Sequence, residues 1–195
     1  QAPVDLYMPQ VVTSGCLPAN GQRIEHGTLT NAALSAPAEV DFFNFCVIAG
    51  DVIRLDIRTV SGAVDPELIV YRPNGTELCR DTSRSPFISL ECTVGSTGTV
   101  TAQIFDRNQN DTGSYNFYLQ RLNNPGASTL SDFGSARTGT LNQQTERKTY
   151  TFNGAAGDII RVDMSRSSGA INPELDIYRP DGSELCEQTT NESEI

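Results

Sequence analysis

An internal repeat constrains the fold of this chain more than any other feature. The segment Gly50–Cys79, GDVIRLDIRTVSGAVDPELIVYRPNGTELC, recurs 107 residues later as Gly157–Cys186, GDIIRVDMSRSSGAINPELDIYRPDGSELC. Pairing the two segments without gaps gives 18 identical residues out of 30, and most other pairs exchange similar side chains, such as Val52 with Ile159. Self-similarity of this kind indicates two copies of one structural unit.

The spacing of the repeat sets the size of that unit. Solenoid repeats usually run about 20–50 residues, and 107 residues is well above that range. The whole chain has 195 residues. We therefore expect two units of ordinary domain size.

The net charge narrows the classes of partner. It is −10, with an isoelectric point near 4.5. Binding to nucleic acid or to anionic lipid needs clustered Lys and Arg, so we expect neither. No apolar run approaches the about 20 residues of a membrane helix, so we expect no membrane insertion. An acidic surface suits a soluble extracellular protein, and carboxylates are also hard ligands for calcium.

Residues 25–122 show the pattern of consecutive strands. The stretch VIRLDIRT alternates apolar residues such as Leu55 with charged ones such as Asp56, which indicates a strand with one solvated face. Turn sequences such as RPNG separate about eight or nine such strands at roughly ten-residue spacing. No stretch has sustained helical periodicity. The fold class expected is therefore all-β, a β-sandwich or jelly roll.

Four segments follow from this pattern: an N-terminal arm (1–24), a first sandwich (25–122), a Gly/Ser/Pro-rich linker (123–136) and the first part of a second sandwich (137–195). The chain starts at Gln1 without a Met or a signal-peptide pattern, which fits a mature exported protein or a fragment. The second copy lacks equivalents of the last strands of the first. Either the chain continues, or another chain supplies the missing strands, because half a sandwich leaves open edges and an uncovered apolar face.

Five cysteines indicate disulfides and an oxidising compartment, since no CxxC pair and only one His are present to suggest zinc. Cys79 and Cys92 end two strands that a short loop brings together, so we expect them to pair. Cys186 repeats Cys79, so its partner should lie in the missing part of the second unit, leaving it unpaired within the chain. Cys16 would then pair with Cys46 and staple the arm to the sandwich. The alternative is that Cys16 or Cys186 bridges to another chain.

The loop DRNQNDTG offers oxygen ligands at Asp106, Asn108, Asn110 and Asp111. Alternating Asp and Asn before a Gly is how calcium loops present their ligands, so this is the candidate metal site, and calcium the one candidate cofactor. It is not an EF-hand, because no Glu follows at the twelfth position. The competing interpretation, which we favour, is a hairpin turn stabilised by Asx side chains.

Other ionisable groups favour structure over catalysis. Asp51 and Asp56 recur as Asp158 and Asp163, at strand and turn positions of both copies, which suggests turn capping or a solvated face rather than an acid–base pair. The sequence has no G-x-S-x-G motif that would supply a nucleophilic serine for His26 to activate. We therefore expect no enzyme activity.

The order of motifs resembles the bacterial pre-peptidase C-terminal (PPC) domain family. The pattern is G-T-L, then an aromatic-x-F strand before A-G-D, then S-G, D-P-x-L, Y-x-P-x-G, and finally D with G-x-Y-x-x-x-L. The first copy carries it throughout, as Gly27-Thr28-Leu29, Phe43-Asn44-Phe45, Ala49-Gly50-Asp51, Ser61-Gly62, Asp65-Pro66, Leu68, Tyr71, Pro73, Gly75, Asp106, Gly113, Tyr115 and Leu119. The second copy matches as far as Leu185. The resemblance covers roughly residues 25–122 and 137–195.

The resemblance implies jelly-roll-like sandwiches in tandem, in a secreted or surface protein of bacteria, without catalytic residues of their own. Some family members bind calcium and some bind substrate polymers. Two functions follow as hypotheses. One is a structural or adhesive segment of a surface protein or fibre, whose partners are copies of itself or neighbouring domains and whose open unit is completed by strand addition. The alternative is an accessory module of a secreted hydrolase or protease that grips an extracellular polymer.

Overall fold

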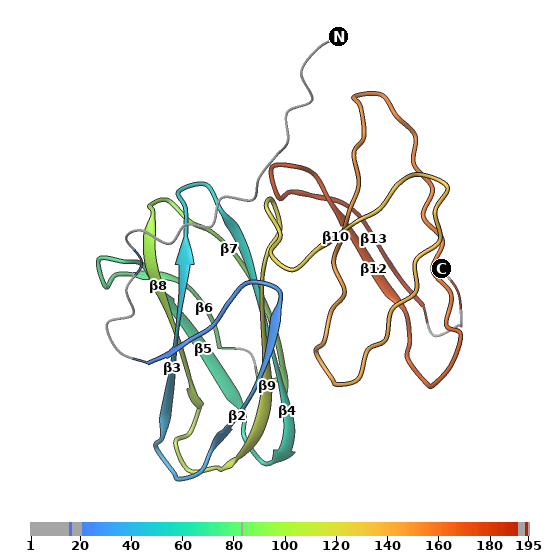
Figure 1. Cartoon of the computed structure of the whole chain (residues 1–195). Coiled ribbons are helices and arrows are strands. Elements are labelled where there is room, and N and C mark those ends of the chain that lie inside the picture. The colour runs from blue at the N-terminus through green and yellow to red at the C-terminus, as the bar shows by residue number, and fades with distance from the viewer. Residues whose placement is uncertain (1–15, 17–20, 83, 191–193, 195) are drawn as a thin grey trace.

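The computed structural model describes residues 16, 21–82, 84–190 and 194. These residues form strands, turns and loops without any helix, and accordingly no helix long and apolar enough to cross a membrane occurs in this part of the chain. The predicted all-β class is confirmed. Figure 1 shows a two-sheet sandwich on one side and a more loosely structured C-terminal part on the other.

Two sheets make the sandwich. The first, in the order β1-β3-β8-β5-β6, comprises β1 (Gln22–Arg23), β3 (Val40–Val47), β8 (Gly98–Asp106), β5 (Pro66–Tyr71) and β6 (Glu77–Asp81). The second, in the order β2-β9-β4-β7, comprises β2 (Thr28–Leu34), β9 (Gly113–Arg121), β4 (Val52–Gly62) and β7 (Phe87–Thr93). All pairs are antiparallel except β1 with β3. Apart from the β5–β6 hairpin, each connection from β2 to β9 crosses between the sheets.

The alternation seen in the sequence fills the space between the sheets. On β4, Ile53, Leu55 and Ile57 are fully buried, and Val100 and Ile104 of β8 are buried in the same core. Each such side chain contributes about 1.5–3 kcal/mol by leaving water. The predicted strands of the first unit are therefore confirmed, and their inward-facing residues build its core.

A disulfide closes one edge of the sandwich. Cys79 of β6 and Cys92 of β7 are bonded, with their Cα atoms 6.3 Å apart, as the sequence predicted. These are edge strands of different sheets. The bond closes a loop of 13 residues in sequence separation, which stabilises the fold by about 3 kcal/mol in the chain-entropy model.

The structure differs from the prediction at the other cysteines. Cys16 and Cys46 are neighbours but are not bonded to each other. The thiol of Cys46 instead donates a hydrogen bond to the main-chain carbonyl of Cys16, over 3.9 Å. Cys186 is unpaired and exposed, as expected. The rest of the predicted arm, residues 1–15 and 17–20, lies outside the described residues.

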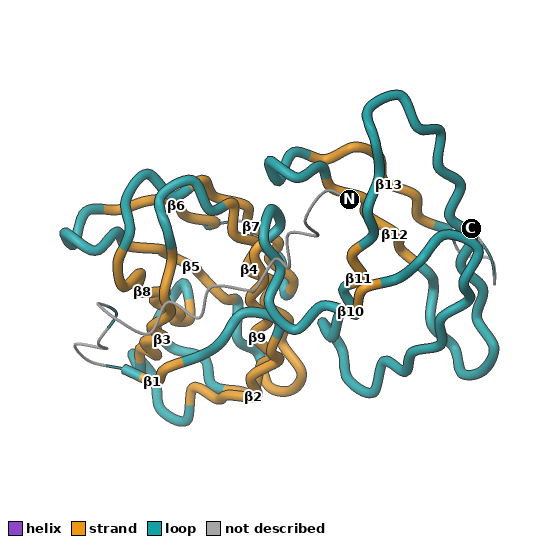
Figure 2. The backbone as a smooth tube through the Cα atoms, turned by 45° about the horizontal axis from the view of Figure 1, so that its top comes forward, coloured by secondary structure: helices purple, strands orange, loops and turns teal. Residues whose placement is uncertain are grey.

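The C-terminal part has less regular structure. β10 (Thr129–Leu130) pairs with β11 (Tyr150–Thr151) in parallel, and β12 (Glu174–Tyr178) pairs with β13 (Glu184–Thr189) in an antiparallel hairpin. This hairpin lies beside the β4–β7–β9 side of the sandwich in both views (Figure 1, Figure 2). Because β10 falls in the predicted linker, that segment is partly built into the C-terminal part.

The β12–β13 hairpin repeats the β5–β6 hairpin in detail. Ile177 pairs with Cys186 as Val70 pairs with Cys79, and both ladders shift register at the next residue. The turns also agree: Gly75 and Gly182 both have positive φ, at 80° and 84°, in the equivalent Y-R-P-x-G turn. At this hairpin the sequence repeat is therefore also a structural repeat.

The repeat does not extend to the strand before it. Residues 159–164 match β4 in sequence, yet they form no strand. In the first copy, β4 is hydrogen-bonded between β9 and β7. Among the described residues, no strand pairs with residues 159–164, so their main-chain N–H and C=O groups take part in no such ladder.

Candidate functional site: a charge cluster between the sandwich and the C-terminal hairpin

The outer face of β4 is covered by the C-terminal part. The charged residues that alternate with the core residues of β4 were expected to face solvent. Instead, Asp56 is fully buried and the side chain of Arg54 is only 11% exposed. The cover consists of the loop around Arg147 and the strand β12. The expectation of a solvated face is wrong here because a segment about ninety residues later in the sequence lies on this face. Local alternation cannot predict so distant a contact.

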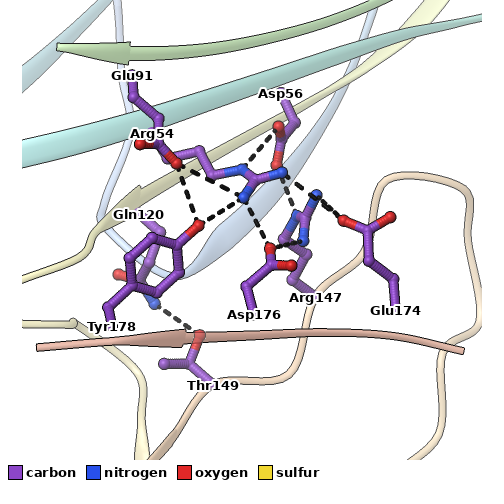
Figure 3. Close-up of polar contacts among 9 residues, drawn as sticks. All are labelled: Arg54, Asp56, Glu91, Gln120, Arg147, Thr149, Glu174, Asp176 and Tyr178. Atoms are coloured by element: carbon purple, nitrogen blue, oxygen red, sulfur yellow. Dashed lines mark hydrogen bonds and ion pairs between the residues drawn. The ribbon is translucent and has the colours of Figure 1, made fainter. Parts of the chain in front are cut away.

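Arg54 is at the centre of the cluster (Figure 3). Its Nε donates to Oδ1 of Asp56 on the same strand at 3.2 Å. Its Nη1 donates to Oδ2 of Asp176 at 2.8 Å and to the hydroxyl of Tyr178 at 2.7 Å. Tyr178 in turn donates to Oε1 of Glu91 on β7, at 3.1 Å. One guanidinium therefore joins two strands of the sandwich to β12.

Arg147 binds the same acids from the other side. Its Nε donates to Oδ2 of Asp56 at 2.7 Å and its Nη1 to Oδ2 of Asp176 at 3.2 Å. Its Nη2 reaches Oε1 of Glu174 at 3.3 Å. Asp56 and Asp176 are thus each shared between Arg54 and Arg147, so the four side chains form a closed ring of alternating charge.

Burial and charge act in opposite directions on these groups. Burial, the largest single effect, would lower the pKa of Arg54 and of Arg147, but the charge and hydrogen bond of Asp56 together with the other nearby acidic groups outweigh it and raise the pKa of both. Burial raises the pKa of Tyr178, although Arg54 opposes the shift. Both arginines therefore stay cationic. Breaking a buried charge pair by removing one partner typically costs about 3–5 kcal/mol, because the other charge is left uncompensated.

Hydrogen bonds made by neutral side chains such as Gln144 surround the ring. Gln144 accepts a hydrogen bond from Nε of Arg58 at 3.0 Å, and its main-chain carbonyl accepts one from Asn116 at 2.8 Å. Gln120 donates to the hydroxyl of Thr149 at 3.0 Å. These bonds join β4 and β9 to the segment that carries Arg147. The contact is therefore polar and directional rather than a loose apolar patch.

Gly182, in the turn of the β12–β13 hairpin, packs directly on the sandwich. A Cβ at this position would lie 2.8 Å from the side chain of Val52 and 3.2 Å from that of Asn123. Its φ is also positive. Glycine here meets both the requirement of the turn and the close approach of the two parts.

Three carboxylates of the hairpin converge beside the ring. Oxygens of Glu174, Asp176 and Glu187 lie within 4.8 Å of one another. Such a group could hold a cation, but Arg54 and Arg147 already bring positive charge to Glu174 and Asp176. These carboxylates therefore belong to the contact surface between two parts of the chain.

A pocket of about 300 Å³ opens next to this surface. Its lining mixes neutral hydrogen-bonding side chains with the exposed Val60; the polar ones are Asn31, Ser114, Asn116, Gln143 and Gln144. None of the described residues that line it is charged. The sandwich and the C-terminal part both contribute to it, so its shape depends on their contact.

The predicted calcium loop folds as a hairpin connection. Asp106 is buried, and its Oδ1 accepts the N–H of Asp65 at 3.0 Å. Its Oδ2 accepts the N–H groups of Asn110 at 3.1 Å and Asp111 at 3.3 Å. Burial would raise the pKa of Asp106, but these N–H donors lower it. A cation would have to share the carboxylate with several N–H groups, so calcium binding at Asp106, Asn108, Asn110 and Asp111 stays a prediction.

The contacts of His26 are structural contacts within the sandwich. Its ring is half-buried, packs edge-on against Phe45 and donates from Nε2 to the carbonyl of Cys46 at 2.8 Å. Burial lowers its pKa to about 4. Asp51 and Asp158 cap equivalent turns: each accepts the N–H three residues earlier, at 2.8 and 2.7 Å.

Sequence reasoning missed Arg147 and Asp176 as site residues. A signal was nevertheless present, because the two hairpin strands ELIVY and ELDIY differ by a charged residue at one inner position. An Asp that replaces an Ile in an otherwise repeated strand indicates a new polar partner. Nothing local could identify that partner as Arg54 and Arg147.

Comparisons with known proteins concern the sandwich fold. No family model matches the sequence, and no curated protein matches it either. Among solved structures, the pre-peptidase C-terminal domain of a collagenase from Bacillus anthracis is similar at 13% identity and a TM-score of 0.45, over 53% of this chain and 98% of that one.

Two further solved structures are PliG proteins, periplasmic inhibitors of g-type lysozyme. The one from Salmonella Typhimurium has 14% identity and a TM-score of 0.37, over 52% of this chain and 99% of that one. The one from Aeromonas hydrophila has 9% identity and a TM-score of 0.35, over 51% and 96%. At TM-scores below 0.5, none of these likenesses carries an argument about function.

Proposed function

We propose that this chain is a non-catalytic, extracellular structural or adhesive protein, a segment of a surface protein or self-assembling fibre in which incoming strands complete the second unit. The observation that carries the proposal is the exposure of apolar residues whose counterparts form the core of the first unit. Val162 is 41% exposed where Leu55 is fully buried, and Ile171 is 37% exposed where Val64 is 3% exposed.

The first unit indicates what would cover these residues. There, the apolar face of β4 and β5 is closed by residues of β7, β8 and β9, including Ile88, Ile104 and Phe117. In the second copy, residues 159–164 form no strand and Val162 stays exposed. A set of strands with that pattern would pair with residues 159–164 and bury their apolar side. Such pairing between chains is strand addition.

The direction of such pairing matters for the assembly. If the strands come from another copy, the contact joins two different surfaces and does not close on itself, so it propagates into a filament. The Cys79–Cys92 disulfide supports the extracellular part of the proposal, because such bonds persist in oxidising compartments.

Sedimentation velocity across a concentration series, with electron microscopy of the same samples, tests the proposal. We expect concentration-dependent species larger than the monomer, and Val162→Asp should abolish them by placing a charge on the face to be buried. Val60→Asp is the matched control, because Val60 is an exposed valine of the first unit. Monomers alone at every concentration would contradict strand addition, as would assembly by the Val162→Asp variant.

The pocket beside the charge cluster favours a second candidate function. Neutral amides and a serine around an apolar patch suit an uncharged polymer, as expected of an accessory binding module. Co-sedimentation with insoluble polysaccharide or collagen, with and without chelator, tests this candidate. Binding that Asn31→Ala and Gln143→Ala weaken would favour it over self-assembly.

A further inference from the structure

Arg147 and Asp176 dock onto an arginine–aspartate pair of the first copy, and both copies contain such a pair. Arg54 and Asp56 of the first copy correspond to Arg161 and Asp163 of the second, by the 107-residue offset. The same atoms join them: Nε of arginine lies 3.2 Å from Oδ1 of aspartate in the first pair and 2.9 Å in the second. We call each of these an acceptor pair.

The residues that dock onto such a pair occur only in the second copy. Arg147 and Asp176 bind the first acceptor pair, but the positions that match them in the first copy hold Val40 and Ile69. The first copy therefore has an acceptor pair without docking residues. The second copy has both, because it carries Arg147 and Asp176 as well as Arg161–Asp163.

Docking is therefore directional, and one acceptor pair remains open. The side chains of Arg161 and Asp163 are 85% and 67% exposed. Among the described residues, Arg161 and Asp163 form an ion pair with each other and with no other side chain. The first acceptor pair, by contrast, is covered by the second copy.

Alternation places the open pair opposite the apolar face. Ile160 and Val162 match the core residues Ile53 and Leu55, while Arg161 and Asp163 lie at the positions between and after them. If residues 159–164 become a strand, the apolar side faces the sandwich interior and the pair faces outward. One segment then carries two separate contacts.

We infer that Arg161–Asp163 is the docking site for a further repeat unit that presents an arginine, an aspartate and a tyrosine arranged as Arg147, Asp176 and Tyr178 are. The inference rests on the proposed role of the chain as a segment in a series of units. It adds that neighbouring units are held by this charge ring as well as by strand addition. Each unit then receives the next in the same orientation.

A donor-only variant tests the inference. Arg54→Gln frees the docking face of the second copy by removing its acceptor in the same molecule, and Arg161→Gln in that molecule prevents self-binding. This labelled double variant is titrated with unlabelled wild-type chain, whose Arg161–Asp163 pair is open, and binding is followed by fluorescence anisotropy. We expect binding that weakens at least tenfold when the unlabelled chain carries Arg161→Gln, and that 1 M salt weakens as well.

Controls separate this contact from strand addition. Arg84→Gln in the unlabelled chain removes an exposed arginine of the first unit and should leave binding unchanged. Adding Asp176→Ile to the labelled chain gives it the residue of the first copy and should abolish binding. If Arg54→Gln prevents folding, Asp56→Asn frees the same docking face. No binding with either variant, or binding indifferent to Arg161→Gln, would overturn the inference, whereas indifference to Val162→Asp would count against strand addition alone.

Discussion

Nε of Arg147 lies 2.7 Å from Oδ2 of Asp56, although 91 residues separate them in the sequence. Asp56 belongs to a strand of the sandwich and Arg147 to the loop that covers it. Their contact turns the outer face of β4 into an internal surface of the chain. The consequences for stability and for the arrangement of the two parts can be measured separately.

The variant Asp56→Ala should be strongly destabilising. It removes the acid shared by two guanidinium groups, of which that of Arg54 is largely buried. Loss of one partner from a buried charge network costs about 3–5 kcal/mol. Urea unfolding followed by circular dichroism measures this loss. Glu77→Ala, which breaks an exposed pair with Arg80, is the control and should leave the free energy of unfolding nearly unchanged, because solvent screens exposed pairs.

The variant Asp176→Ile should release the hairpin while leaving the sandwich folded. It restores the residue of the first copy at a position where Arg54 and Arg147 require a carboxylate. We expect faster protease cleavage between residues 123 and 150 and a larger radius of gyration in small-angle scattering. A variant as compact and as protease-resistant as wild type would show that the charge ring does not hold the two parts together.

Stability should fall as the pH falls from about 6.5 toward 4, because of His26. Burial lowers the pKa of His26 from 6.5 in the unfolded chain to about 4 in the folded one. Between these values the unfolded state binds a proton that the folded state does not. The free energy of unfolding therefore falls with decreasing pH, by at most about 3 kcal/mol.

Denaturant unfolding at a series of pH values tests the role of His26. In His26→Gln the slope between pH 6.5 and 4 should flatten, because Gln does not titrate. Below pH 4 the lowered pKa of Asp106 takes over, since protonating its carboxylate weakens the bonds from backbone N–H groups. An unchanged slope in the variant would assign the pH dependence to other groups.

The three unbonded thiols should react in a defined order. Cys186 is exposed, Cys16 is buried, and burial raises the pKa of Cys46 to about 11, with Cys16 adding to the shift. Since the thiolate is the nucleophile, alkylation at pH 8 should label Cys186 first and Cys46 slowly. Mass spectrometry of a time course measures the order. If neither Cys16 nor Cys46 becomes alkylated at any time, the two thiols have instead oxidised to the disulfide predicted from the sequence.

Strand positions followed from the sequence because they depend on local patterns. The alternation of Leu55 with Asp56, the aromatic residues of β3 and the turn at Gly75 are each visible within about ten residues. The Cys79–Cys92 disulfide was also predictable, because it joins strands connected by one short loop. The role of Asp106 is decided by backbone N–H groups around it, which the sequence shows only as a choice between a turn and a ligand loop.

The sequence by itself determined that this chain is all-β and that it contains one repeated segment. Tertiary structure alone decided what covers the outer face of β4. Periodicity reports which side of a strand is polar, but a polar side can meet either water or a matching set of charges. Arg54, Asp56, Arg147 and Asp176 meet one another because two distant segments are folded together, and that proximity is not encoded in the pattern of either segment.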